Sequence, residues 1–418
     1  MTNEMQSWHL NKRTLLLHPL FVFSFVWLSV AFLYSLHLSG WLVYSTREVL
    51  AVTGYILIPF LGIVAFYSAF HHFKNLAYRP RPNTNGFNLD LLERRLTMWF
   101  RVWMLLSLFE ILVSGGLPII WLLRQSTKNY MDFGVTSLHG LVNALLLSVG
   151  TCRFALYLIT GDRKHLRIPI FVLVWSVLAV TRAMMVEALV EYAVVFLSLR
   201  KIRPGTIARI VVTALLVVLV FGFVGDIRGG AESFRGSARP TAQYPDWLPS
   251  GVLWVYIYIT TPINNLMYSE QTTQPANNML FPHTTSDFVP NALRPGDAQS
   301  AQAGVRLVTS AFNVCTAYLN PYEDYGAFGM IIFSALTAFL CQFFWYRTSL
   351  SDVLIYAALT RCLIFTIFSN VFFAPSAIAK ILWVLLFFMP KVRLGKRANS
   401  TLGRVKFSRA DTDFTFPS

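Results

Sequence analysis

Long apolar runs separated by short polar segments dominate the chain. A helix needs about 20 mainly apolar residues to span a bilayer. Runs of about this length lie at about 18–38, 49–70, 98–117, 138–160, 207–224, 328–345 and 353–369, and a shorter run taken as a last span lies at about 377–388. A further stretch, 168–199, is too long for one span and too short for two full ones. The pattern predicts an α-helical bundle embedded in a membrane.

Positive charge follows the apolar runs in a regular order. Lysine and arginine beside spans are retained in the cytoplasm, and basic segments lie at 12–13, 71–95, 161–167, 200–204 and 391–397. Because both segments flanking 168–199 are basic, this stretch is predicted to be two short membrane segments that meet around Arg182 to Glu187. We therefore expect an all-α polytopic membrane protein of about ten transmembrane helices, with both termini cytoplasmic and an uncleaved first helix.

One long polar segment, about 226–325, differs from every basic connection. It contains no lysine, five arginines and several acidic residues, which is the opposite of a cytoplasmic loop. We expect this segment on the periplasmic side, between the seventh and eighth helices. The predicted organisation is helices 1–7 in residues 1–225, the outer loop in 226–325, helices 8–10 in 326–390 and a basic cytoplasmic tail in 391–418.

The amino-acid composition is typical of a protein that is surrounded by lipid. Of the 418 residues, 55% are hydrophobic and 13% charged, which does not fit a soluble multidomain protein. The net charge of +15 would suggest nucleic acid, but the basic residues lie beside apolar runs, so no nucleic-acid partner is expected. The four cysteines have no paired spacing, and neither a metal site nor a cofactor is predicted.

Three arginines stand at the start of the long polar segment. Arg228 belongs to Gly225-Asp-Ile-Arg-Gly-Gly, and Arg235 and Arg239 complete a set within twelve positions. Guanidinium groups bind phosphate oxygens bidentately, and flanking glycines let backbone N–H groups approach the same anion. The segment predicts a diphosphate clamp at the membrane surface. The alternative is an ordinary polar turn whose arginines meet lipid headgroups.

Aromatic and amide side chains follow in Trp254-Val-Tyr-Ile-Tyr-Ile-Thr-Thr-Pro-Ile-Asn-Asn-Leu. Aromatic faces stack on sugar rings and amides bond hydroxyls, so the candidate sugar-binding residues are Tyr256, Asn264 and Asn265. An aromatic belt at the membrane interface explains the tryptophan and the tyrosines equally well. The segment therefore favours either a saccharide site or an interfacial anchor.

Ionisable residues inside the apolar runs need a partner or a wet cavity, because each costs about 2.5–3.5 kcal/mol on insertion scales. Arg101 and Glu110 lie in one run, and Arg182 and Glu187 lie at the centre of 168–199. We expect them to be either functional groups or members of ion pairs between helices.

Two histidines are placed near the predicted outer side. His139 follows the Tyr130-Met-Asp-Phe-Gly segment at the edge of a span, and His283 lies with Asp287 in the long polar segment. An imidazole titrates near neutral pH and serves as a general base in many enzymes. Both histidines are thus either candidate bases or satisfied structural groups.

Five segments carry a family likeness: Tyr130-x-Asp-Phe-Gly, Leu138-His-Gly, Gly225-Asp-x-Arg-Gly, Thr261-Pro-Ile-Asn-Asn-Leu and Asn320-Pro-Tyr-Glu-Asp-Tyr-Gly-Ala-Phe-Gly. With these segments and its hydropathy, the chain resembles the Wzy-type oligosaccharide repeat-unit polymerases, which make bacterial O-antigen and related polysaccharides. The resemblance implies a metal-independent reaction at the periplasmic face of the bacterial inner membrane. There a growing glycan would leave undecaprenyl diphosphate and join an incoming lipid-linked repeat unit.

The resemblance also implies roles for the candidate residues. The donor or acceptor diphosphate would be held by Arg228, Arg235 and Arg239, with help from Arg182 or Arg306. The acceptor hydroxyl would be deprotonated by Asp132, His139 or Glu187. The implied partners are the two lipid-linked oligosaccharides, membrane lipid and a chain-length regulator. Alternatives are an O-antigen ligase or another lipid-linked glycosyltransferase and, in a different class, a polysaccharide flippase or transporter.

Overall fold

The computed structural model describes residues 15–77, 89–128, 130–136, 138–200, 231–245, 250–288, 306–309 and 312–389, with positions 205, 208, 209, 212 and 216. The basic tail and most of the predicted span at 207–224 lie outside these residues, as does Arg228. Within the described part the chain is helical and contains no strand. An isolated β-bridge joins Ser39 to Pro240.

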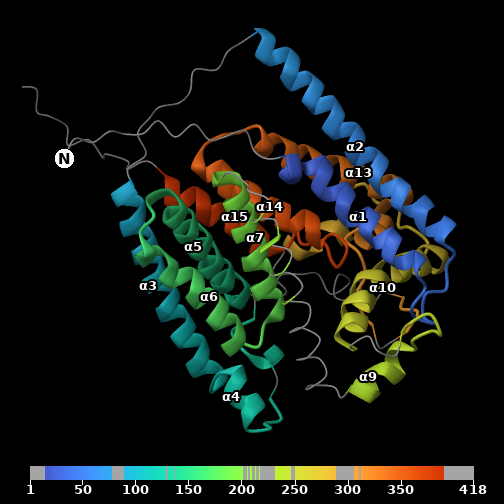
Figure 1. The fold of residues 1–418 in the computed structure, drawn as a ribbon, viewed down its shortest axis with the longest axis horizontal. Coiled ribbons are helices and arrows are strands. Elements are labelled where there is room, and N and C mark those ends of the chain that lie inside the picture. Colours follow the sequence, from blue (N-terminus) through green and yellow to red (C-terminus); the bar gives the residue numbers. More distant parts are fainter. Residues whose placement is uncertain are drawn as a thin grey trace, which may run out of the picture.

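Helices fill most of the described chain (Figure 1). The first half contains α1 (Pro19–Ser35), α2 (Thr46–Ala77), α3 (Leu89–Ser114), α4 (Pro118–Leu123), α5 (Leu138–Thr160), α6 (Arg167–Leu178) and α7 (Arg182–Leu199). The second half contains α9 (Ala231–Ala238), α10 (Ser250–Thr272), α11 (Pro282–Thr285), α13 (Leu319–Trp345), α14 (Leu350–Phe365) and α15 (Pro375–Phe388). Short 3₁₀ turns, η1 to η4, cover Leu15–Leu17, Tyr130–Asp132, Arg163–Leu166 and Ser286–Phe288.

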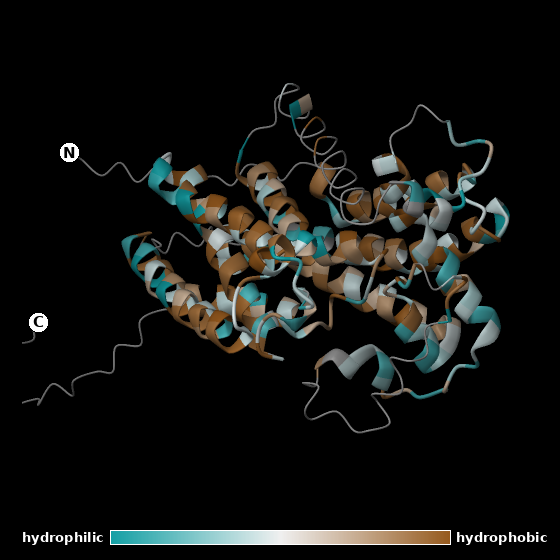
Figure 2. Cartoon of the chain, turned by 90° about the horizontal axis from the view of Figure 1, so that it is seen from below, coloured by the Kyte–Doolittle hydropathy of each residue, from teal (hydrophilic) through white to brown (hydrophobic). Residues whose placement is uncertain are grey.

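Several of these helices have the length and composition of membrane spans. In the described part, four stretches are long and apolar enough to cross a bilayer: Thr46–His72, Leu89–Leu123, Leu138–Thr160 and Leu319–Trp345. Two shorter apolar helices, α1 and α15, pack with them. Figure 2 shows hydrophobic residues along the helices and hydrophilic residues toward helix ends and connections. The prediction of a membrane-embedded α-helical protein is confirmed, and the total of about ten spans stays a prediction.

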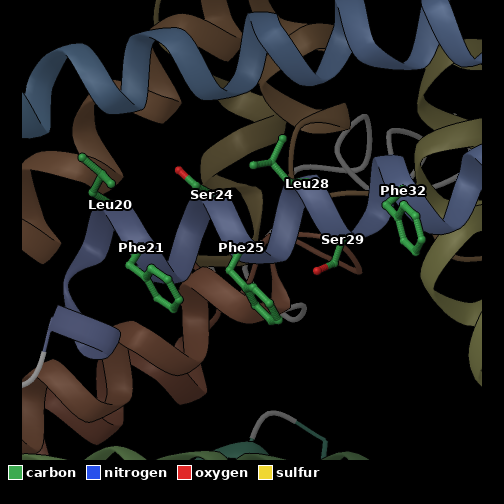
Figure 3. Close-up of a pocket in the computed structure, with 7 residues that line it drawn as sticks. All are labelled: Leu20, Phe21, Ser24, Phe25, Leu28, Ser29 and Phe32. Carbon is green, nitrogen blue, oxygen red and sulfur yellow. The ribbon is translucent and has the colours of Figure 1, made fainter.

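One face of α1 is apolar and open. A shallow groove on it is lined by Leu20, Phe21, Ser24, Phe25, Leu28, Ser29 and Phe32 (Figure 3). Phe25 and Phe32 are 63% and 65% exposed, whereas Phe23 and Trp27 on the other face are fully buried. Large exposed apolar patches mark contact with lipid or with partners, so this face of α1 is suited to acyl chains.

The stretch 168–199 forms two helices, as the charge pattern predicts. The turn between α6 and α7 lies at 179–181, where Val180 has φ +54°. It precedes the predicted meeting point, because α7 already begins at Arg182. The side chain of Glu187 therefore projects from within a helix and not from a turn.

Helix ends that the charge pattern assigns to the cytoplasm lie together in space. His18, before α1, has its Nε2 atom 3.4 Å from Gln342 Nε2 near the end of α13. Arg95, near the start of α3, donates to the carbonyl oxygen of Phe387 at the end of α15 at 2.9 Å. We call this end of the bundle the basic end.

A buried polar cluster joins α3 to the α5–α6 connection at the basic end. Arg153 donates to Thr97 Oγ1 at 2.5 Å and to His165 Nδ1 at 3.0 Å. Lys164 pairs with Glu93 at 3.1 Å. Burial lowers the pKa of His165, so its ring stays neutral and accepts the hydrogen bond from Arg153.

The predicted outer loop is not a loop throughout. Residues Ser250–Thr272 form α10, a largely buried helix that contacts α1, α9 and α13. Its apolar residues are interrupted by Thr260, Thr261, Pro262 and two asparagines, which lower its hydropathy below that of a span. The predicted periplasmic connection 226–325 thus contains a helix that packs against α1, and its periplasmic side stays a prediction.

An extended connection between α1 and α2, residues 36–45, runs along α10. Near its start, the Leu38 N–H donates to Tyr256 Oη at 2.9 Å. Near its end, Tyr44 Oη donates to Gln271 Oε1 at 3.1 Å. We call this connection, together with the described residues of 231–325, the cap; it lies at the end of the bundle opposite the basic end (Figure 1).

Candidate functional site

His139, at the start of α5, has polar partners on both ring nitrogens. Its Nδ1 lies 3.2 Å from Glu110 Oε2 of α3, and its Nε2 lies 2.9 Å from Asn143 Nδ2, one helical turn along α5. A carboxylate accepts and an amide nitrogen donates, so Nδ1 carries the proton and the Nε2 lone pair receives the Asn143 N–H. No lone pair is left for a substrate. The geometry favours the structural interpretation of His139 over a general base.

The backbone after η2 closes over the His139 ring. Gly134 has φ +91°, and a Cβ atom built on it would lie 2.5 Å from His139 Nδ1. The Gly134 N–H donates to Ser114 Oγ at 2.8 Å, and the Val135 N–H donates to Glu110 Oε1 at 3.3 Å. The Tyr130-Met-Asp-Phe-Gly segment thus holds the imidazole in place. Its last position requires glycine, because a side chain there would have a disfavoured φ and would collide with the ring.

Gly134→Ala is expected to lower the free energy of unfolding by about 1–3 kcal/mol, because the new methyl group collides with His139 at a disfavoured φ. Gly140→Ala is the matched control, since a Cβ there meets nothing within 4 Å and the site is helical. The control should be neutral or stabilising by up to about 1 kcal/mol. Thermal unfolding in detergent, followed by circular dichroism, measures both. Equal melting temperatures for the two variants would contradict the proposed contact.

Glu187 belongs to a buried network of four charged side chains. Its carboxylate forms a close ion pair with Arg361 of α14, and Glu191, one turn further along α7, lies 3.6 Å from Arg361 Nε. Glu191 also pairs closely with Lys380 of α15 and accepts from Thr151 Oγ1 of α5 at 2.8 Å. Two cations neutralise two carboxylates, so Glu187 serves an ion pair between helices and is not poised as a base.

Sequence reasoning missed three members of this network: Glu191, Arg361 and Lys380. Arg361 and Lys380 each interrupt an otherwise apolar predicted span, and Glu191 stands four residues after Glu187. Buried charges inside spans call for partners of opposite sign, so these positions contained the signal. Which helices would face each other was not readable from the sequence.

The remaining residues proposed for the bundle lie near the cap end. Asp132 is exposed in η2, and Arg182 begins α7 directly after the α6–α7 turn. The structure does not place either of them in the network around Glu187. His139 and Glu187 are thus used in contacts within the fold, and the role of Asp132 stays a prediction.

Arg239 is an exposed residue of the cap. It follows the C-terminus of α9, and its guanidinium lies over the indole of Trp41 at 4.1 Å from the ring centroid. Trp41 is fixed in turn, because its Nε1–H donates to the Ser237 carbonyl oxygen at 2.7 Å. The Gly40 N–H donates to the Arg239 carbonyl oxygen at 2.8 Å. Arg235, in the last turn of α9, stands one turn before Arg239.

Arg239 lies beside the 36–45 connection, and the clamp of Arg228, Arg235 and Arg239 stays a prediction. Arg239 has φ +47°, a left-handed conformation that few non-glycine residues adopt. In the described part of the chain, no carboxylate lies within 4 Å of the Arg239 guanidinium. An exposed arginine held by stacking on one face is suited to an anionic ligand.

The amides predicted to bind sugar are used by the fold. Asn264 accepts from Tyr34 Oη at 2.7 Å and donates to the Trp41 carbonyl oxygen at 3.0 Å. Asn265 donates to the carbonyl oxygens of Phe312 and Val314 at 2.9 and 2.8 Å. Both side chains are buried, and these contacts hold the cap together. The sugar-binding interpretation of these residues is replaced by a structural one.

Tyr256 and Arg306 differ in how accessible they are to a ligand. Tyr256 is 4% exposed and its hydroxyl receives the Leu38 N–H, so it too is a structural group. Arg306 is exposed, and its carbonyl oxygen accepts from Ser269 Oγ near the end of α10 at 3.2 Å. This contact places the backbone of Arg306 next to the last turn of α10.

Comparison with known proteins adds no relative to this picture. No family model matches the chain, and neither a curated protein nor a solved structure matches it. The function therefore has to be argued from the residues themselves.

Proposed function

We propose that the protein is a membrane glycosyltransferase that polymerises undecaprenyl-diphosphate-linked oligosaccharide repeat units into O-antigen or a related surface polysaccharide. The reaction takes place at the periplasmic face of the bacterial inner membrane, on the side of the cap. The observation that carries the proposal is the exposed Arg239 stacked on Trp41, beside Arg235, at the end of an apolar helical bundle. The family-like segments in the sequence support the same reaction.

The arginines suit a lipid diphosphate. A guanidinium that stacks through its face keeps in-plane N–H groups for oxygen ligands, and planar forks match phosphate geometry. Arg235 lies one helical turn before Arg239, so a second positive charge stands close in sequence to the arginine that would bind the diphosphate. Negative charge that develops on the leaving diphosphate is stabilised by the same groups.

The neighbouring helix suits the lipid tail. The open face of α1 runs along Phe21, Phe25, Leu28 and Phe32 (Figure 3) and leads to the connection that contains Trp41. An isoprenoid chain on this face places its diphosphate near the cap arginines. Head and tail of one ligand thus meet complementary surfaces on neighbouring elements.

Deletion of the gene in its host tests the proposal. The lipopolysaccharide of the deletion strain, separated on a gel, should show core carrying a single repeat unit. A normal long-chain ladder would refute the polymerase. Complete loss of O-antigen would instead favour a ligase, which differs in its acceptor, or a flippase, which forms no glycosidic bond. Re-expression of the wild-type gene should restore the ladder.

A further inference from the structure

A second histidine–carboxylate pair lies in the cap. His283 of α11 has its Nδ1 atom 3.9 Å from Glu323 Oε2 in the first turns of α13. The Glu323 side chain is 9% exposed and the His283 side chain 27% exposed. At 3.9 Å the two side chains are neighbours without a direct hydrogen bond. The carboxylate therefore keeps acceptor capacity for another donor.

Several hydrogen bonds fix the backbone of His283 and Thr284. Asp324 is fully buried and accepts from the His283 N–H at 2.8 Å and from the Thr284 N–H at 2.7 Å. Asn320 donates to the His283 carbonyl oxygen at 3.2 Å, and Asn370 donates to the Thr284 carbonyl oxygen at 3.1 Å. Side chains from two parts of the C-terminal half, α13 and the α14–α15 connection, thus hold one short turn beside Glu323.

The backbone around the pair is also specialised. The segment leading into α11 contains two non-glycine residues with positive φ, Asn277 at +53° and Phe281 at +52°. α13 breaks directly after the acidic residues, at Tyr325 and Gly326, and Gly326 has φ +60°. Such conformations cost free energy and concentrate at functional sites. The break separates the first turns of α13, which contain Glu323, from the rest of the helix.

The surroundings suit a saccharide that carries a phosphate. Tyr322, next to Glu323, donates its hydroxyl to the Glu270 carbonyl oxygen at 2.8 Å. The backbone of Arg306 is bonded to Ser269, the residue before Glu270. Burial raises the pKa of Glu270 to about 7, so this part of the cap favours the protonated form of a carboxyl group. The backbone of Arg306 and of Glu270 thus lies at the end of α10, next to the turns of α13 that contain Tyr322 and Glu323.

We propose that Glu323 and His283 form the acceptor site of the polymerase, with Glu323 as the catalytic base. The proposal rests on the polymerase function and supplies a base in place of His139 and Glu187, whose polar atoms are used within the fold. The acceptor hydroxyl gives its proton to the Glu323 carboxylate while its oxygen bonds the anomeric carbon of the donor. The bond from that carbon to the diphosphate breaks, and the diphosphate leaves with the electron pair. Glu323 then releases this proton to water, and His283 beside it serves as a positioning residue for the carboxylate.

The test uses the full-length protein in proteoliposomes, with undecaprenyl-diphosphate-linked repeat units extracted from a deletion strain. Glu323→Gln keeps the shape of the side chain and should lower the polymerisation rate by about 10²–10⁴-fold. Glu323→Ala should recover part of its rate when formate is added, because a small carboxylate replaces the missing base. Glu232→Gln, an exposed acid on α9, is the matched control and should retain the wild-type rate.

The outcomes separate the two proposals. If wild-type protein forms no polymer, the polymerase function itself fails. If wild type forms polymer and Glu323→Gln keeps the full rate, the assignment of Glu323 is overturned. If Glu323→Gln does not fold, His283→Gln decides: a loss of at least about tenfold with an unchanged melting temperature supports the site, and a wild-type rate refutes it.

Discussion

Arg361→Met is expected to lower the free energy of unfolding by about 3–5 kcal/mol, because it leaves buried carboxylates without a counter-ion. In the native protein Arg361 is 1% exposed and pairs with Glu187 and Glu191. After the substitution, Lys380 alone faces two negative charges. Methionine fills a similar volume, so the loss measures charge and not a cavity. Unfolding in detergent mixtures, followed by circular dichroism, reports the change.

A charge-neutral double variant is the control for that experiment. Glu191→Gln combined with Lys380→Met removes one charge of each sign and leaves the pair of Glu187 and Arg361. It alters more groups than Arg361→Met and is still expected to destabilise less, because no net charge stays buried. If Arg361→Met were as stable as wild type, the network would not hold α7 against α14 and α15.

Arg239→Ala is expected to weaken binding of undecaprenyl diphosphate by about 10- to 150-fold, since hydrogen bonds to charged groups contribute about 1.5–3 kcal/mol. The long-chain ladder should collapse while the protein stays in the membrane. Arg239→Lys keeps the charge but loses the planar stack on Trp41, so an intermediate loss is expected. Binding of the purified lipid diphosphate to protein in nanodiscs measures the three affinities.

Arg347→Ala serves as the matched control for Arg239. Arg347 is also an exposed arginine over an aromatic ring, 4.9 Å from the centroid of Phe343, but it lies at the basic end. Removing it should leave lipid diphosphate binding and the ladder unchanged. Wild-type binding by Arg239→Ala, or an equal loss in both variants, would remove the specific role of the cap arginine.

The membrane part of the fold was predictable because lipid imposes a length and a charge rule. α5 occupies the predicted span at 138–160, and α6 and α7 form the pair of helices that the basic flanks of 168–199 require. Backbone groups must be satisfied internally in lipid, so an apolar run of this length has few structures available. Local sequence therefore carries most of the information in these regions.

The cap and the site were less predictable because tertiary contacts decide them. α10 contains asparagines and threonines that a hydropathy scale counts as polar. Asn264 and Asn265 are nevertheless buried, and they donate hydrogen bonds to carbonyl groups far away in the sequence. His139 looks like a base in sequence, and only its pairing with Glu110 and Asn143 shows that both nitrogens are used. Glu323 stands out only once His283 is placed beside it.

The pairing of residues 36–45 with α9 and α10 bears on the order of assembly. Ser39 bonds the Ala238 carbonyl oxygen across 199 positions, and Trp27 bonds Thr366 across 339. During synthesis the first two helices enter the membrane long before these partners exist, so their connection stays hydrated until the second half of the chain has emerged. The arginine site is therefore completed only once α9 has been synthesised, and a chain that ends before α9 would insert without acquiring it.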